Sequence, residues 1–316
     1  MKVLDLFSGA GGFSLGFKRA GFEIALAIEN FPKNAETFKQ NFPESKVIVE
    51  DIKKIKTSLV DFKPFVVIGG PPCEPYTPIN PKREKKPIDR LYKDPIGSLV
   101  LEFIRFVADL QPEFFVMENV VQVAEGELKN ALAYEFERIG YKPYFNVLRA
   151  EEYGVPSKRA RMFISNIKLK PKKEKRVTVW QAIGELPDPR DEHNIPNHVY
   201  KSLPRRIKRK VYKLKFEQAL VYFDRFKDYV RLHPNKPAPT IRGTSRFIHP
   251  FDDRLITVRE QARLMSFPDS FIFQGGFSIQ YNQVGEAVPP KLAEKIAEVI
   301  KVVSKAHDDE VGHPCG

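Results

Sequence analysis

A cysteine on a stiff loop is the residue of this sequence best placed to act as a nucleophile. The apolar run Phe65–Ile68 is followed at once by Gly69-Gly70-Pro71-Pro72-Cys73. An apolar run ended by glycine and proline predicts a buried strand that stops abruptly. Cys73 would then lie just past the carboxyl end of that strand, where open α/β sheets bind ligands. The prolines restrict the loop and hold the thiol in place for attack. The alternative is a small buried hydrophobic residue without a chemical role.

A glycine-rich turn near the N-terminus predicts a site for a nucleoside cofactor. The turn Phe7-Ser8-Gly9-Ala10-Gly11-Gly12 follows the first expected strand and opens a helix, so its backbone can approach a ligand closely. Ser14 stands where a dinucleotide fingerprint would have a third glycine, which weakens a nicotinamide interpretation. Glu29 ends the second expected strand and could bind ribose hydroxyls. Asp51 ends the third and could accept a hydrogen bond from adenine, or be a surface residue.

Three further charged residues could act on a substrate. Glu118 follows an apolar run, and if its strand lies beside the one before Cys73, carboxylate and thiol are neighbours. A nearby carboxylate opposes ionisation of a thiol, so we expect Glu118 to bind or protonate the substrate rather than to activate the sulfur. Arg159 and Arg161 occupy alternate positions, which places both on one face of a strand. They could bind a substrate or a phosphate, or lie on a solvated edge.

Short apolar runs alternate with helical patterns in the first part of the chain. This alternation predicts an α/β fold with a doubly wound, Rossmann-like, mostly parallel sheet. The expected strands are Lys2–Phe7, Glu23–Ile28, Lys46–Val49, Phe65–Ile68 and Phe114–Met117. The expected helices follow the glycine turn to about Ala20 and span Lys33–Asn41, Gly97–Leu110, Val258–Met265 and Pro290–Val303.

Composition excludes several classes of protein. The 316 residues are 42% hydrophobic and 29% charged, which is ordinary for a globular protein with a sizeable core. No apolar run is long enough to cross a bilayer, and the N-terminus lacks the layout of a signal peptide. The two cysteines, Cys73 and Cys315, provide no disulfide framework. We therefore expect a cytoplasmic protein that does not bind membranes.

Positive charge is concentrated in one stretch of the chain. The net charge is +12, and the stretch from Lys168 to Lys215 holds fifteen Lys and Arg against five Asp and Glu. Interleaved aromatic residues such as Tyr200 and Tyr212 favour a polyphosphate partner, although such a run can also be a solvated face. Several prolines predict an irregular insert rather than a regular sheet. We expect a catalytic domain at 1–167, an insert at 168–250 and a segment at 251–316 that returns to the catalytic domain.

In this order, the residues resemble those of the C5-cytosine methyltransferases that act on DNA. The resemblance covers nearly the whole chain outside the basic insert. Each motif is weak alone, but seven in the right order and spacing are very specific. The motifs are Phe7-x-Gly9-x-Gly11-Gly12, Glu29, Asp51, Pro71-Pro72-Cys73, Glu118-Asn119-Val120, Arg159-x-Arg161 and Gln283-x-Gly285.

The resemblance implies the fold of S-adenosylmethionine-dependent methyltransferases and a cofactor, S-adenosyl-L-methionine, lying across the strand ends. Glu29 would bind its ribose and Asp51 its adenine. The full set of implied cofactor-binding residues is Phe7, Gly9, Gly11, Gly12, Glu29, Asp51, Ile52 and Pro72. No metal ion is implied.

The resemblance also implies a covalent mechanism on a cytosine flipped out of the duplex. Cys73 would attack C6, which makes C5 nucleophilic toward the methyl group. Glu118 would contact N3 and the amino group, and Arg161 with Arg159 would hold the base. The basic insert would recognise the target in double-stranded DNA. The protein would act as a monomer, and a restriction endonuclease that recognises the same site could accompany it.

Three other functions remain open from the sequence. The nearest is methylation of cytosine in tRNA, which a branch of the same family performs with the same catalytic set. A catalytically silent nucleic-acid-binding module is disfavoured because Cys73, Glu118 and Arg161 are all retained. A nicotinamide oxidoreductase is disfavoured by Ser14 and by the Pro-Pro-Cys loop. The chain also departs from the family pattern, with Glu74 and Ser157 in place of glutamines and Glu286 in place of an asparagine.

Overall fold

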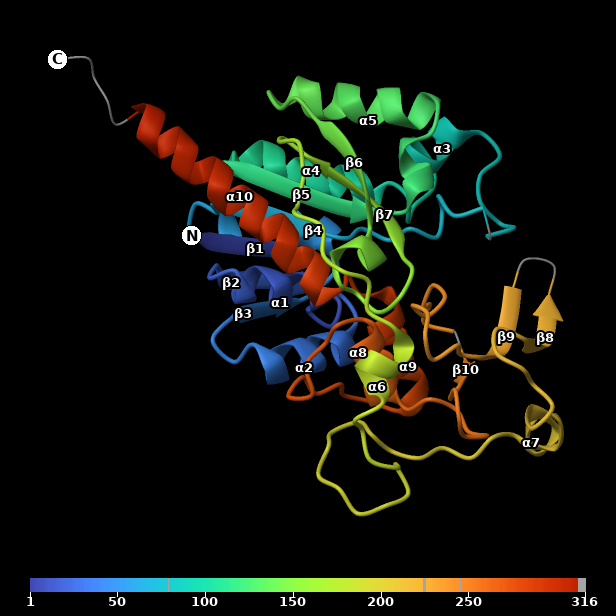
Figure 1. Ribbon diagram of the computed structural model, residues 1–316. Coiled ribbons are helices and arrows are strands. Elements are labelled where there is room, and N and C mark those ends of the chain that lie inside the picture. Colours follow the sequence, from blue (N-terminus) through green and yellow to red (C-terminus); the bar gives the residue numbers. More distant parts are fainter. Residues whose placement is uncertain (79, 224–225, 245, 312–316) are drawn as a thin grey trace.

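A seven-stranded sheet forms the centre of the computed structural model, which describes residues 1–78, 80–223, 226–244 and 246–311 (Figure 1). Cys315 lies outside the described residues. The strand order is β3-β2-β1-β4-β5-β7-β6, and β1 to β6 all run in the same direction, whereas β7 is antiparallel to both of its neighbours, β5 and β6. The predicted doubly wound, mostly parallel sheet is therefore confirmed. The strands are β1 (Lys2–Leu6), β2 (Glu23–Glu29), β3 (Lys46–Val49), β4 (Val66–Gly69), β5 (Phe114–Asn119), β6 (Tyr144–Arg149) and β7 (Ala160–Ser165).

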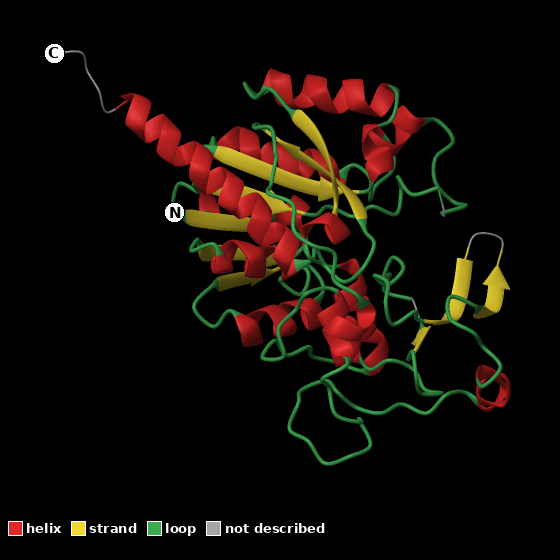
Figure 2. Ribbon diagram, viewed as in Figure 1, coloured by secondary structure: helices red, strands yellow, loops and turns green. Residues whose placement is uncertain are grey.

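Helices cover both faces of this sheet (Figure 2). Successive strand residues point to opposite faces, so Val3 joins one hydrophobic core and Leu4 joins the other. The first core includes residues of α1 (Gly12–Arg19), α2 (Pro32–Asn41) and α10 (Pro290–Val311). The second includes residues of α3 (Pro87–Tyr92), α4 (Leu99–Leu110) and α5 (Glu127–Arg138). Two-sided burial explains why the parallel strands are apolar throughout.

Most predicted elements begin and end close to the observed bounds. The closing helix is an exception, because the prediction ends it at Val303 whereas α10 continues to Val311. No glycine or proline interrupts that extension, so nothing local ends the helix. The prediction also lacks α3, α5 and β6. None of the helices in the described part of the chain is long and apolar enough to cross a membrane.

The basic region carries a small sheet of its own, which corrects the expectation of an irregular insert. Its order is β10-β9-β8, and it lies apart from the central sheet (Figure 1). The buried Arg231 guanidinium binds the region together by donating to the carbonyl oxygens of Val211, Leu214 and His249, at 3.0, 3.0 and 3.1 Å. The domain boundaries at 168 and 250 stay predictions. The elements here are α6 (Val179–Ile183), α7 (Arg205–Val211), β8 (Ala219–Phe223), β9 (Phe226–Arg231) and β10 (Phe247–Ile248).

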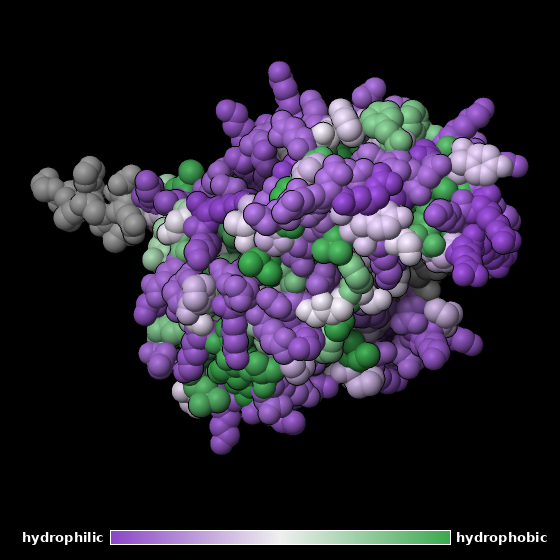
Figure 3. Space-filling view, turned by 90° about the horizontal axis from the view of Figure 1, so that it is seen from below, coloured by the Kyte–Doolittle hydropathy of each residue, from purple (hydrophilic) through white to green (hydrophobic). Residues whose placement is uncertain are grey.

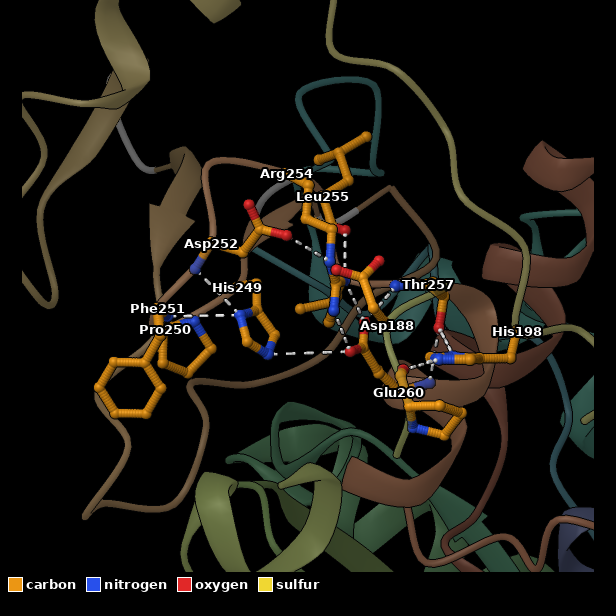
Figure 4. A network of polar contacts seen from close by, with 12 residues as sticks. Asp188, His198, His249, Pro250, Phe251, Asp252, Arg254, Leu255, Thr257 and Glu260 are labelled. Carbon is orange, nitrogen blue, oxygen red and sulfur yellow. Dashed lines mark hydrogen bonds and ion pairs between the residues drawn. The ribbon is translucent and has the colours of Figure 1, made fainter. Parts of the chain in front are cut away.

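A buried polar network connects this region to α8 (Val258–Leu264), which is followed by α9 (Phe277–Glu286) (Figure 4). The Arg254 guanidinium donates two hydrogen bonds to the Glu260 carboxylate, at 2.7 and 2.8 Å. Glu260 also completes the N-terminal capping box of α8 with Thr257. His198 Nδ1 lies 2.8 Å from the Thr257 hydroxyl. The start of α8 is thus tied to two separate segments, one within the predicted insert at His198 and one just after it at Arg254.

Candidate active site

Cys73 lies on a loop that is held at both ends. The loop leaves β4, and the Asn119 side chain at the end of the adjacent β5 donates a hydrogen bond of 3.1 Å to the Pro71 carbonyl oxygen. Beyond the cysteine, the Cys73 carbonyl oxygen accepts from the backbone N–H groups of Tyr76 and Thr77, at 3.0 and 3.1 Å. The thiol is partly buried. These contacts confirm that the loop follows the carboxyl end of a buried strand.

Glu118 and Arg161 form an ion pair beside this loop. Arg161 Nε lies 3.0 Å from Glu118 Oε1, and both side chains are mostly buried. A Cβ placed on Gly70 would lie 3.3 Å from Glu118 Oε2, so the carboxylate faces the turn that leads to Cys73. Because β4 and β5 are parallel neighbours, their ends bring thiol and carboxylate together as the sequence predicts. The structure thus gathers a thiol, a carboxylate and a guanidinium.

The surroundings keep the sulfur protonated in the free protein. Burial, followed by the charges of Glu118 and Glu74, raises the pKa of Cys73 to about 11, while Arg161 and Arg159 oppose this rise. Glu118 therefore does not activate the thiol by its charge, as expected from the sequence. A substrate that neutralises Glu118 would lower the cost of forming the thiolate.

Arg159 is oriented differently from Arg161. It precedes β7, is buried, and donates to the carbonyl oxygens of Ile241 at 3.0 Å and Gly285 at 2.9 Å. Its backbone N–H donates to the Glu151 carboxylate at 3.1 Å. Burial, with the charge of Arg161, lowers the pKa of Arg159 to about 9. Arg159 thus connects the strand to the loop at Ile241 and to the end of α9, and its role on the base stays a prediction.

The three glycines of the N-terminal turn have different surroundings. Gly9 has φ 54°, and a Cβ there would meet no atom within 4 Å. Gly11 has φ 97°, and a Cβ there would lie 2.5 Å from the Phe42 ring. A Cβ at Gly12 would lie 2.4 Å from the Val288 carbonyl oxygen. Gly9 therefore faces open space, whereas Gly11 and Gly12 allow close packing. Phe7, at φ 60°, also has a left-handed backbone.

Acidic residues at the ends of β2 and β3 lie near this turn. The Glu29 carboxylate accepts from the backbone N–H groups of Gly9 and Phe31, at 2.7 and 2.8 Å, which orients it. Burial raises the pKa of Glu29, and these hydrogen bonds oppose the rise. The Asn34 side chain and the Asn30 backbone also donate to this carboxylate. Asp51 accepts from the Lys53 N–H at 3.0 Å and caps a short helical turn that begins with the buried Ile52.

Unpartnered polar atoms lie at the same place. The buried hydroxyl of Ser8 and one carboxyl oxygen of Asp5 have no hydrogen-bond partner among the described residues. The open space over Gly9, the oriented Glu29 carboxylate and the Ser8 hydroxyl together fit a nucleoside with free hydroxyls. Pro72 is partly exposed next to Cys73. The prediction does not identify Ser8 or Asp5 as site residues, although an acid within the apolar strand Lys2–Leu6 is a signal.

Glu74 and Glu286, known from the sequence only as departures from the family pattern, belong to this site. Removal from water, followed by the charges of Glu74 and Glu29, raises the pKa of Glu286. Gln283, three residues earlier, fixes the last turn of α9. The Thr37 hydroxyl donates to the Gln283 side-chain oxygen, and the Gln283 side-chain amide donates to the Lys33 carbonyl oxygen, both at 3.1 Å. The late Gln-x-Gly motif is thereby attached to α2.

Comparisons with known proteins identify the family of this chain. The model of the C-5 cytosine-specific DNA methylase family matches residues 1–302. A protein of Methanocaldococcus jannaschii, provisionally named type II methyltransferase M.MJ0563P, is 49% identical over 315 residues, covering 95% of this chain and 99% of that protein. Type II methyltransferase M1.HphI of Haemophilus parahaemolyticus is 36% identical over 327 residues, covering 95% of this chain and 86% of that protein.

A solved structure has the same architecture over nearly the whole chain. It is provisionally described as a DNA modification methyltransferase encoded within a prophage (E. coli), and its TM-score is 0.79 at 26% identity. The match covers 96% of this chain and 99% of that one. The chain therefore belongs to the C-5 cytosine-specific DNA methylase family and is a DNA (cytosine-5-)-methyltransferase.

Proposed function

We propose that this protein methylates C5 of a cytosine flipped out of duplex DNA, with Cys73 bonded transiently to C6. The observation that carries this proposal is the Glu118–Arg161 pair, 3.0 Å apart, beside the loop that holds the thiol. A carboxylic acid can contact the ring nitrogen and amino group of cytosine, and a guanidinium can contact its carbonyl oxygen. The carboxylate and guanidinium can thus hydrogen-bond to the base and orient it next to the Cys73 sulfur.

Cytosine needs this activation because C5 of an aromatic ring is a poor nucleophile. The Cys73 sulfur adds to C6, and the electron pair of the ring double bond becomes available at C5. C5 takes the methyl group, then loses its proton, and the bond between sulfur and C6 breaks. Glu118 stabilises the charge that develops at N3. When Glu118 shares a proton with the base, its charge no longer opposes the Cys73 thiolate.

The methyl donor that we propose is S-adenosyl-L-methionine, which when bound supplies a methyl group on a positively charged sulfur. Glu29, oriented by the Gly9 and Phe31 backbone N–H groups, would accept from the ribose hydroxyls. Gly9 leaves room for the ligand, which Phe7, Ser8 and Pro72 would border. Gly11 and Gly12 shape the turn by close packing. Asp51 and Ile52 would contact the adenine.

Duplex DNA is the proposed partner, and the basic insert its proposed contact surface. Flipping a base costs roughly a few kcal/mol, which contacts elsewhere on the duplex must offset. The relatives are type II methyltransferases, so we propose that the protein protects a site from a restriction endonuclease. We further propose a monomer in the cytoplasm, where reducing conditions keep the Cys73 thiol free.

Labelled methyl transfer tests the proposal directly. The protein is incubated with methyl-labelled S-adenosylmethionine and either genomic DNA or total tRNA, and the modified base is identified. We expect label on C5 of cytosine in DNA, and none after Cys73→Ser. Duplexes with 5-fluorocytosine at the mapped site should trap a covalent complex, because fluorine cannot leave C5 as a proton does. Labelling of tRNA alone would contradict the DNA substrate, and full activity of Cys73→Ser would contradict the mechanism.

A further inference from the structure

Glu286 lies at the border of the proposed cofactor site. It ends α9, and the two residues after it pack against the first turn of α1. A Cβ on Gly12 would lie 2.4 Å from the Val288 carbonyl oxygen and 3.0 Å from Ala287 Cβ. Because Gly12 directly follows the glycine turn, this packing fixes Glu286 beside the turn.

The other side of the same segment is held by the cytosine half of the site. The Arg159 guanidinium donates to the carbonyl oxygens of Gly285, at 2.9 Å, and Glu286, at 3.4 Å. The charges of Glu118 and Cys73 both act on this guanidinium. Glu286 is therefore positioned between the glycine turn and the residues proposed to hold cytosine.

The carboxylate of Glu286 is poorly compensated in the free protein. Its side chain reaches solvent and has no hydrogen bond or ion pair with a described residue. Its partial removal from water, followed by the negative charges of Glu74 and Glu29, raises the pKa of Glu286, while the positive charge of Arg159 opposes this rise. Three carboxylates near one another repel, so a cation that enters among them would be stabilised.

We propose that Glu286 makes the protein prefer S-adenosylmethionine over S-adenosylhomocysteine by interacting with the positive charge on the methyl-bearing sulfur. The inference rests on the proposed function, from which it takes the cofactor. Transfer to cytosine requires that this sulfur face the half of the site that contains Cys73, and Glu286 lies between the halves. The two ligands share their amino, carboxyl and adenosine groups and differ only in the methyl group and the charge that it brings. Their affinity ratio therefore isolates the effect of Glu286 on that charge.

Calorimetric titration of the full-length protein with each ligand tests this inference without requiring activity. We expect Glu286→Gln to lower the ratio of affinities, S-adenosylmethionine over S-adenosylhomocysteine, by roughly tenfold, about the effect of one solvent-screened ion pair. Glu286→Asn, the residue of the family pattern, should act in the same way and serves if the first variant does not fold. Glu137→Gln, which neutralises an exposed glutamate on α5, should leave the ratio unchanged. In the wild-type protein, higher salt should reduce the ratio.

The outcomes separate this inference from the proposed function. An unchanged ratio in the folded variants, or an equal decrease in affinity for both ligands, would overturn the role of Glu286 alone. A wild-type protein that binds neither ligand would overturn the cofactor and the inference together.

Discussion

At the scale of single residues, the active site places a thiol near a carboxylate whose charge opposes ionisation of the thiol. Burial and the charge of Glu118 raise the pKa of Cys73 to about 11, so the resting protein holds a thiol. Such a thiol is protected from oxidation and alkylation, which require the thiolate. The Cys73 thiol would then become reactive only when a bound substrate neutralises the Glu118 carboxylate.

Neutralising Glu118 should therefore make the cysteine more reactive and the enzyme less active. In Glu118→Gln the pKa of Cys73 should fall, because Arg161 and Arg159 remain while the opposing charge is gone. We expect alkylation of Cys73 by iodoacetamide at pH 8 to accelerate about tenfold for each unit by which the pKa falls. Methyl transfer should fall by roughly a hundredfold or more, because charge at N3 of the base is no longer stabilised.

The measurement uses a Cys315→Ser background, so that Cys73 is the single cysteine. Glu113→Gln is the matched control, since Glu113 is exposed just before β5, at the end opposite Glu118. Its alkylation rate should equal that of the parent. Slower alkylation of Glu118→Gln than of the parent would contradict the electrostatic account of this site.

The sequence predicts which residues gather in the site better than what each one contacts. Cys73, Glu118 and Glu29 each follow an apolar strand, and parallel neighbours bring such ends together. Arg159 has the same local signal as Arg161, yet donates to Gly285, 126 positions away. No local pattern encodes that contact, because it depends on how the end of α9 packs against the sheet.

At the scale of elements, the start of α8 depends on a buried ion pair. Glu260 is 1% exposed and Arg254 5% exposed, and together they connect the chain just after the insert to the helix (Figure 4). Glu260→Gln would remove the buried charge that Arg254 contacts most closely and leave it, among the described residues, only an ion pair with the partly exposed Asp252, at 3.1 Å. We expect the free energy of unfolding, from urea denaturation, to fall by about 3 kcal/mol. Glu298→Gln removes an exposed pair with Lys295 and should change it by less than about 0.5 kcal/mol. Similar decreases in the free energy of unfolding of the two variants would contradict a stabilising role of the Glu260–Arg254 pair.

Helix α7 gathers exposed cations at the outer end of the insert. Figure 3 shows mainly hydrophilic residues along the right-hand edge of the molecule, the side on which Figure 1 places α7. Buried Val211 anchors the helix. None of its cations forms an ion pair with a described residue. The exposed cations are Arg205, Arg206, Lys208, Arg209 and Lys210.

We expect α7 to contact DNA phosphates. Replacing Arg205, Arg206 and Arg209 by glutamine should weaken DNA binding at low salt. The slope of log affinity against log salt should decrease by roughly one for each phosphate that the helix no longer binds. Fluorescence anisotropy at several salt concentrations measures this slope.

A matched triple variant on the far side of the sheet tests whether the effect is local. It neutralises three exposed cations on or next to α5, namely Lys129, Arg138 and Lys142. Its slope should stay that of the wild type, although the net charge changes equally. Equal slopes in the two triple variants would mean that α7 makes no direct contact.

The insert is also the part of the fold that the sequence predicts least well. Its prolines and cations suggest irregular chain, yet Ala219–Phe223 and Phe226–Arg231 pair as β8 and β9. β8 is apolar and aromatic throughout, whereas β9 has three charged residues among its aromatic and apolar ones. Their stability comes from contacts such as those of Arg231, whose hydrogen-bond partners are carbonyl groups up to 21 positions away. Strands of the central sheet, buried on both faces, have the clearer apolar signal.

At the scale of the whole molecule, two buried groups limit the pH range of stability from opposite sides. Burial lowers the pKa of His249 to about 4, so stability decreases as pH falls from about 6.5 toward that value. Burial raises the pKa of Asp5 to about 8, opposed by the Ser14 hydroxyl, which donates to Asp5 at 2.6 Å. Ser14, which counts against a dinucleotide fingerprint, thus has a structural role here.

Asp5 should make the folded protein less stable in alkaline solution. Its pKa is raised above the ordinary value of 3.8, so near neutral pH the folded state holds a proton that the unfolded state has released. The stability from this group is complete below about pH 4 and is lost as pH rises through about 8. Asp5→Asn keeps the shape and cannot ionise, so its melting temperature relative to wild type should rise by several degrees between about pH 5 and pH 8.5. Asp61→Asn, at an exposed position, should show no such trend. A difference between Asp5→Asn and wild type that is constant with pH would mean that Asp5 is already ionised in the folded protein, and its hydrogen bond from Ser14 would then outweigh burial.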